Sequence, residues 1–180
     1  DLVGRINAIA RREAEEIEQR YPKVLRRVGG YNLDMMLPAG ANMAHLLVGS
    51  EGTLGFVVEL TMKLATLPQD PTVLVLAVDS MESAMHVLQT FQSRLPLMAF
   101  EFFSEKALRH VIAEKGLQRP CETVGEFYAL IEFENISEQS MEHAMEAFEY
   151  CVEQGWALDG TISQNSSQAR DLWRLREDIS

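Results

Sequence analysis

Three glycines recur at a three-residue spacing inside an otherwise apolar stretch. The stretch is NMAHLLVGSEGTLGFVVELTMKL, residues 42–64, and the glycines are Gly49, Gly52 and Gly55. Glycine permits a positive φ and a close approach of the backbone, but it weakens a strand. Glycines at this spacing therefore indicate a turn, which either closes a wide hairpin or brings backbone amides close to a flat ligand.

Two common phosphate-binding loops do not match these glycines. A Rossmann loop has the spacing GxGxxG and leads into a helix, whereas this stretch has GxxGxxG and the pattern predicts a strand after it. A Walker loop requires Gly-Lys-Ser/Thr, which does not follow here. A structural hairpin loop and a turn pressed against a ligand both remain open.

A second candidate for chemistry is the stretch DLWRLREDIS, residues 171–180. Its helical pattern places Trp173 and Arg176 three residues apart on one side. Arginine is suited to binding a carboxylate because its planar fork meets both oxygens and stays charged. From the residues alone, the simplest interpretation is a surface helix with mixed charges.

Metal chemistry is not indicated by the histidines or the cysteines. None of the histidines forms an HxH or HxxxH pair, so we predict no metal site. The two cysteines are far apart, and we interpret them as reduced thiols. The histidines are His45, His86, His110 and His143, and the cysteines are Cys121 and Cys151.

Composition excludes two classes of partner. The formal net charge is −11, and no Lys/Arg cluster is large enough to give a basic face, so we expect no nucleic-acid partner. No apolar run approaches the roughly 20 residues of a membrane-spanning helix. We therefore expect a cytoplasmic protein, either free or peripheral to the inner face of the membrane.

The elements that must position these residues fall into two parts. Residues 2–20 have the spacing of an amphipathic helix, and Pro22 marks its end. Residues 43–49 and 54–64 have the pattern of two strands around the glycine turn. The stretch TLPQDPT, residues 66–72, then reads as a domain boundary because it carries two prolines with polar spacers.

Strands and helices alternate after this boundary. Two β-α-β patterns with an extra helix between them predict an antiparallel sheet backed by helices on one face, a ferredoxin-like α+β arrangement. Ser80 and Ser104 are candidate helix N-caps. The predicted strands are 73–79, 97–103, 127–134 and 156–162, and the predicted helices are 80–94, 104–115, 137–154 and 165–179.

The stretch AHLLVGSEGTLGFVVELTMKLATLP, with GYNLDMML before it, resembles the signature that closes the FAD-binding domain of FAD-linked oxidases related to vanillyl-alcohol oxidase. That group includes the D-lactate, glycolate and D-2-hydroxyglutarate dehydrogenases. The resemblance implies that residues 1–66 are the C-terminal part of an FAD-binding α+β domain. It implies that residues 67–180 are the N-terminal part of the substrate domain that follows.

The resemblance also implies site residues. Arg176 matches an arginine that grips the substrate carboxylate, and Ser180 matches a hydroxyl position one turn later. The catalytic residues, and any iron–sulfur segment, are expected beyond Ser180. The family more often has Ile where Phe56 stands. The implied FAD-binding residues are Gly49, Ser50, Glu51, Gly52, Thr53, Gly55, Phe56 and Val57.

The function that this resemblance implies is oxidation of a 2-hydroxy acid to the 2-oxo acid by hydride transfer to FAD. The chain would be a fragment of a D-lactate or D-2-hydroxyglutarate type dehydrogenase, inactive by itself and holding little or no FAD. The hydroxy acid, the electron acceptor and a homodimer remain open. Two alternatives are a flavin oxidase that uses O₂ on an alcohol and a non-catalytic ferredoxin-like interaction module.

Overall fold

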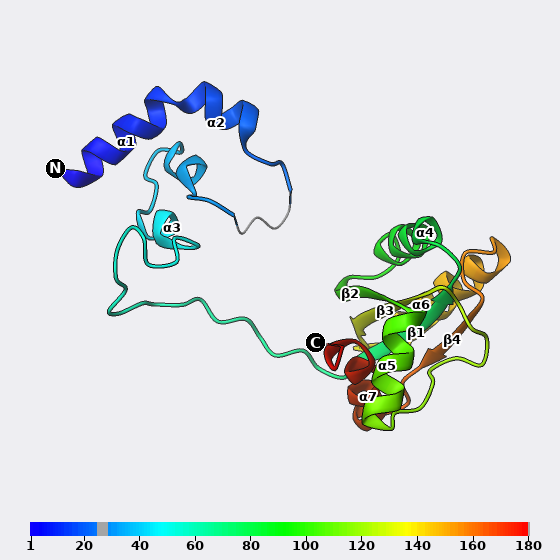
Figure 1. Cartoon of the computed structure of the whole chain (residues 1–180). Coiled ribbons are helices and arrows are strands. Elements are labelled where there is room, and N and C mark those ends of the chain that lie inside the picture. Colours follow the sequence, from blue (N-terminus) through cyan, green and yellow to red (C-terminus); the bar gives the residue numbers. More distant parts are fainter. Residues whose placement is uncertain (25–28, 180) are drawn as a thin grey trace. The chain divides into compact units, whose positions relative to one another are not determined.

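A computed structural model describes residues 1–24 and 29–179 (Figure 1). The chain divides into two compact units, Asp1–Leu64 and Ala65–Ser180, and each has its own apolar core. Within the described residues, no helix is both long enough and apolar enough to cross a membrane.

The first unit begins with two consecutive helices. The single helix predicted over residues 2–20 is present as α1 (Leu2–Arg12) and α2 (Ala14–Arg20), which meet at Glu13. Asp1 caps α1, because its side chain accepts a hydrogen bond from the backbone N–H of Val3 at 3.1 Å. The second helix ends just before Pro22, as predicted.

A small core holds the rest of the first unit against α1. The 3₁₀ helix η1 (Leu33–Met36) and the short helix α3 (Ala44–Leu47) supply Met36 and Leu46, which are buried together with Ala10 of α1.

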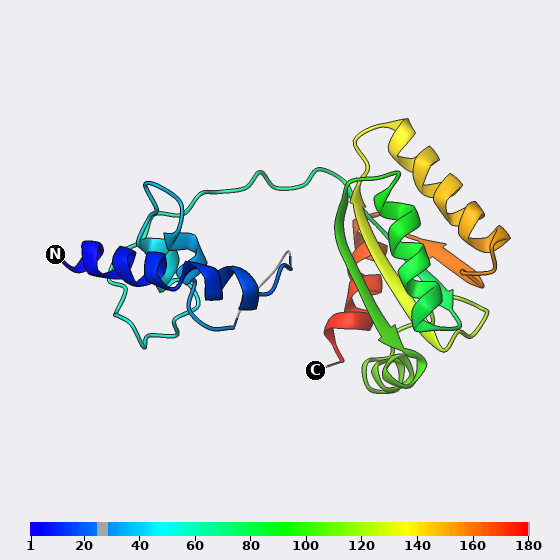
Figure 2. The same ribbon diagram turned by 90° about the horizontal axis from the view of Figure 1, so that it is seen from above.

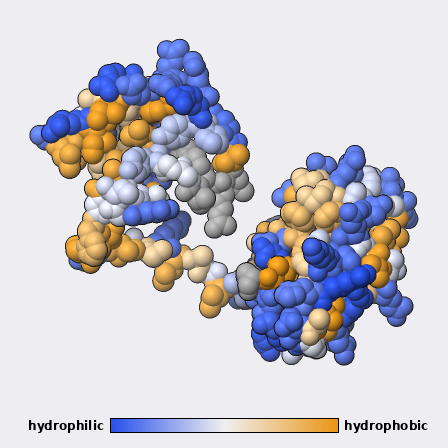
Figure 3. All heavy atoms as spheres, in the orientation of Figure 1, coloured by the Kyte–Doolittle hydropathy of each residue, from blue (hydrophilic) through white to orange (hydrophobic). Residues whose placement is uncertain are grey.

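The prediction of two strands around the glycine turn, at residues 43–49 and 54–64, is wrong. Residues 44–47 form α3, and residues 54–64 form neither helix nor strand. A strand is stable only when a neighbour pairs with its backbone and its apolar side chains are covered. Here Phe56 and Val58 are 91% and 90% exposed, and Figure 3 shows apolar side chains at the surface along the segment after the turn. The apolar pattern alone therefore does not make this segment a strand.

The second unit contains a four-stranded antiparallel sheet with the strand order β2-β3-β1-β4. This order and the alternation of strands with helices are those of the predicted ferredoxin-like α+β fold, with an extra helix between the second and third strands. The strands are β1 (Pro71–Val78), β2 (Leu97–Ser104), β3 (Phe127–Glu134) and β4 (Asp159–Ile162).

Helices cover both faces of this sheet, so the prediction of helices on one face was wrong (Figure 2). Seven of the eight residues of β1 are buried, and Leu74 and Val75 belong to opposite cores. Because both faces of the central strands are apolar, each face needs its own layer of helices. On one face lie α4 (Met81–Gln92) and α6 (Glu138–Glu153), and on the other α5 (Glu105–Lys115) and α7 (Ser166–Glu177).

Side-chain caps fix where these helices begin. Ser80 accepts a hydrogen bond from the backbone N–H of Ser83 at 3.0 Å, and Ser104 accepts one from Ala107 at 3.3 Å, which confirms both predicted caps. Asn165 caps α7 in the same way. The cap therefore fixes the residue at which α7 begins.

Candidate functional site

The glycine turn of the first unit is closed by its own hydrogen bonds. The backbone N–H of Ser50 donates to the carbonyl of Leu47 at 3.2 Å. The carbonyl of Ser50 accepts from both the N–H and the Oγ1 of Thr53, at 2.9 and 2.6 Å. Tyr31 adds a hydroxyl contact to Thr53 Oγ1 at 2.8 Å. These bonds close the turn, and Ser50 within it is only 5% exposed.

The backbone conformation of the turn explains its glycines. Gly49 and Gly52 have φ values of 77° and 78°, a region that glycine adopts without steric cost. A Cβ atom at either position would meet no atom within 4 Å, whereas a Cβ at Gly55 would lie 3.7 Å from the side chain of Leu47. The space over the first two glycines is therefore open, and a flat molecule could contact the backbone there.

The residues after the turn add an exposed apolar surface. Phe56 is 91% exposed and Val57 is 52% exposed. A ring and a branched side chain beside an open backbone fit a flat aromatic cofactor in shape and polarity. Glu51 is also exposed, with a φ of 50°.

Arg176 lies on α7 in the second unit and points to the sheet. Its Nε donates to Glu101 Oε2 of β2 at 3.1 Å, and its side chain is 38% exposed. Trp173, on the same side of the helix, donates from Nε1 to Glu132 Oε1 of β3 at 2.9 Å. Two hydrogen bonds, one turn apart, thus attach this side of α7 to two strands. Ser180 lies outside the described residues.

The predicted site residues fall into both units. Residues 49–57 belong to the first unit, and Arg176 belongs to the second. The roles predicted for both groups stay predictions.

A partly buried polar cluster in the second unit was missed from the sequence. Glu105, the first residue of α5, accepts two hydrogen bonds from the guanidinium of Arg119, at 2.9 and 2.8 Å. The hydroxyl of Tyr128 donates to Glu105 at 2.8 Å and accepts from Arg119 at 2.8 Å. Arg109 adds a hydrogen bond at 2.6 Å. In the sequence, the only local sign of this cluster is an acidic residue directly after the serine that caps α5.

The cluster shifts the pKa values of its members. The hydrogen bonds from Arg119 are the largest cause that lowers the pKa of Glu105, from 4.5 to about 2. Burial, followed by the hydrogen bond to Glu105, raises the pKa of Tyr128 to about 12. Both groups therefore keep one protonation state at neutral pH, which suits a structural tie better than acid–base catalysis.

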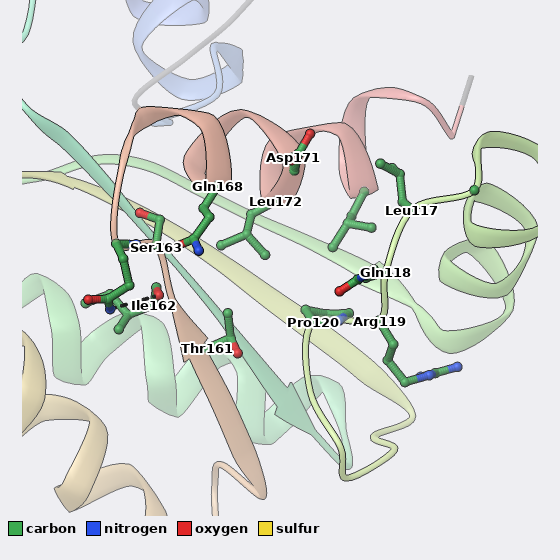
Figure 4. Close-up of a pocket in the computed structure, with 13 residues that line it drawn as sticks. Leu117, Gln118, Arg119, Pro120, Thr161, Ile162, Ser163, Gln168, Asp171 and Leu172 are labelled. Carbon is green, nitrogen blue, oxygen red and sulfur yellow. Dashed lines mark hydrogen bonds between the residues drawn. The ribbon is translucent and has the colours of Figure 1, made fainter.

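Arg119 also belongs to the wall of a pocket of about 540 Å³ (Figure 4). The pocket lies between the loop after α5, the end of β4 and the first turns of α7, and Figure 4 shows the side chain of Arg119 extending away from Gln168. The cluster holds this loop in place. Arg176 does not line the pocket, so the pocket is separate from the predicted carboxylate contact.

The cysteines and acidic groups of the described chain do not form a metal centre. Cys121 and Cys151 are both free and buried, as expected of reduced thiols. Burial raises the pKa of Cys121 to about 12. Across residues 1–24 and 29–179, no group of three or more His, Cys, Asp and Glu residues could hold a metal ion.

Comparison with known proteins gives one matching family model and several similar proteins. Residues 67–180 match the family model of FAD linked oxidases, C-terminal domain. The chain is 50% identical over 150 residues to a D-2-hydroxyglutarate dehydrogenase of Stutzerimonas stutzeri. The aligned residues make up 83% of this chain and 32% of that protein. It is 46% identical over 142 residues to a D-2-hydroxyglutarate dehydrogenase of Xanthomonas citri pv. viticola, covering 79% of this chain and 30% of that protein.

A more distant relative bears another name. The chain is 28% identical over 143 residues to a D-lactate dehydrogenase of Anaerostipes hadrus, covering 77% of this chain and 30% of that protein. The chain thus spans about a third of the length of these relatives.

Proposed function

This chain belongs to the FAD-linked oxidases, and we propose on that premise that it is part of an enzyme that oxidises a 2-hydroxy acid to the 2-oxo acid. D-2-hydroxyglutarate and D-lactate are the substrates to test, because relatives with 50% and 28% identity bear those names. In this proposal residues 1–66 are the C-terminal part of the FAD-binding domain, and residues 67–180 begin the substrate domain.

The glycine turn is proposed to contact the cofactor. FAD, when bound, accepts the hydride that leaves the hydroxy acid. The open space over Gly49 and Gly52 lets the backbone reach van der Waals contact with a flat ring. The hydrogen bonds between Ser50 and Thr53 hold the turn in shape before the cofactor arrives, so little order has to be gained on binding. Phe56 and Val57 would cover the apolar part of the ligand.

Arg176 is proposed to bind the carboxylate of the hydroxy acid. The observation that carries this proposal is its hydrogen bonding: Nε is bonded to Glu101, and no other residue in the described part of the chain bonds to its two terminal nitrogens. Two parallel N–H groups are the donor pair that a carboxylate accepts in a bidentate contact. A neutral alcohol has no carboxylate to accept these two hydrogen bonds, which favours a hydroxy acid over an alcohol as substrate.

The test uses the full-length protein that contains these residues, purified without added flavin. Its visible spectrum is recorded anaerobically, and D-2-hydroxyglutarate and D-lactate are added separately, with the L-enantiomers as controls. We expect a bound flavin that one D-acid bleaches. Arg176→Lys should raise KM for that acid by at least about tenfold, since lysine cannot form the bidentate contact.

Two results would contradict the proposal in different ways. If a flavin is bound but neither acid reduces it, the assignment to the family stands and the proposed substrate class is rejected. A well-folded protein without flavin would leave the glycine turn with a purely structural role.

A further inference from the structure

Arg176 differs from its neighbour Arg174 in where its partner lies. Arg174 pairs with Asp171 and Asp178, which flank it along the chain, at 3.9 and 3.2 Å. Arg176 pairs with Glu101, 75 positions away on β2. An ion pair within a helix restrains a side chain only relative to that helix. The pair between Arg176 and Glu101 instead fixes a guanidinium relative to the sheet.

The register of the sheet shows why Glu101 faces α7. Glu101 lies opposite Leu130 of β3, and opposite residues in an antiparallel ladder point to the same face. Leu130 belongs to the core that α7 covers. Glu132, which accepts from Trp173, lies opposite Ala99 and is therefore on the same face, two residues along. The face under α7 thus presents two carboxylates, and each bonds a different side chain of the helix.

We propose that Glu101 is a positioning residue for substrate binding: it holds Arg176 by Nε and so aims the two terminal nitrogens at the substrate carboxylate. The proposal rests on the proposed role of Arg176. An unrestrained arginine samples many rotamers and loses that freedom when it binds a ligand. A carboxylate at Nε fixes the plane of the guanidinium beforehand and leaves the outer edge of the fork for a second carboxylate.

The charges around the pair agree with this role. Glu101 and Arg176 are 40% and 38% exposed, so water screens their attraction and the ion pair adds little stability. A weak, half-exposed pair is a poor device for holding a domain together. It is sufficient to select one rotamer of Arg176.

The experiment measures kcat and KM in the full-length enzyme with the hydroxy acid that bleaches its flavin. Glu101→Ala removes the contact, and Glu101→Gln keeps an oxygen that accepts from Nε. Glu132→Ala is the matched control, because it removes a carboxylate on the same face that bonds α7 through Trp173 and not through Arg176. Arg176→Ala tests the proposed function itself. Unfolding in urea, followed by tryptophan fluorescence, gives the stability of each variant.

We expect Glu101→Ala to raise KM about tenfold with a smaller change in kcat, the size of one lost charge-assisted hydrogen bond. Glu101→Gln should recover most of this loss, and Glu132→Ala should leave KM within about twofold while lowering the urea midpoint. If Glu101→Ala does not fold, Glu101→Asp decides, since it keeps the charge but is one methylene too short, and its KM should also rise.

Other results overturn the inference. An unchanged KM in the Glu101 variants, together with a raised KM in Arg176→Ala, would remove the positioning role and keep the proposed function. A lower KM in Glu101→Gln would show that Glu101 competes with the substrate for the arginine. A wild-type KM in Arg176→Ala would remove the carboxylate contact itself, and the inference with it.

Discussion

The carboxylate of Glu105 is expected to stabilise the second unit. Its pKa is lowered from 4.5 to about 2, chiefly by the hydrogen bonds from Arg119. At about 1.4 kcal/mol for each pKa unit, this shift corresponds to about 3 kcal/mol at neutral pH. The side chain of Arg119 is 30% exposed and that of Arg109 is 69% exposed, so water screens part of the interaction. We therefore expect Glu105→Gln to lower the free energy of unfolding by about 2 kcal/mol at pH 7.

The effect of Glu105→Gln should depend on pH in one direction. The folded-state pKa lies below the unfolded value, so the stabilisation is complete above about pH 4.5 and is lost as the pH falls toward 2. The difference between wild type and variant should therefore shrink at pH 3 to about half of its value at pH 7, or less. Neutral surface substitutions have no such dependence.

Urea unfolding of the 180-residue chain, followed by tryptophan fluorescence, measures this difference. Both tryptophans, Trp156 and Trp173, lie in the second unit, so the signal reports on that unit alone. Glu142→Gln on the exposed side of α6 is the matched control and should change stability by less than about 0.5 kcal/mol. Equal stabilities of the two variants at pH 7, or an undiminished penalty at pH 3, would refute the reasoning.

Three further perturbations test other parts of the structure. Gly125→Ala places a Cβ 2.6 Å from the backbone oxygen of Val78, so it should lower the free energy of unfolding by about 2 kcal/mol or more in the same urea assay. Cys121 is buried with a pKa of about 12, so Ellman's reagent at pH 8 should modify it only after unfolding; rapid reaction in the native chain would contradict its burial. In the full-length protein, Gly52→Val should reduce flavin content, whereas Gly40→Val, with a similar φ of 76° outside the turn, should not; equal losses would assign the effect to backbone strain.

Local signals in the sequence predicted most of the second unit. The apolar run of β1 and the serines before α4 and α5 depend only on residues next to one another, so their interpretation was confirmed. The prediction of helices on one face of the sheet was wrong, because the burial of both faces depends on tertiary packing between elements. The strands predicted around the glycine turn failed for the same reason, since a strand needs a partner that its own sequence does not specify.

Side-chain clusters were even less accessible to sequence reasoning. Glu105, Arg119 and Tyr128 are brought together by a helix start, a loop and a strand, and no spacing in the sequence links them. The polar residues of an amphipathic strand or helix look alike in sequence, whether they face water or a partner.

The contact between Glu101 and Arg176 shows how far such a prediction can go. A glutamate inside the apolar strand LMAFEFF is visible in the sequence, and so is an arginine three residues after a tryptophan on the last helix. Their meeting depends on the register of β2 against β3, which shifts by one residue between Leu97 and Ala99. A slip of one residue would turn Glu101 to the opposite face, toward α4 and α6, and leave Arg176 without it. If Glu101 aims the arginine as we propose, substrate affinity depends on this strand register as well as on the arginine itself.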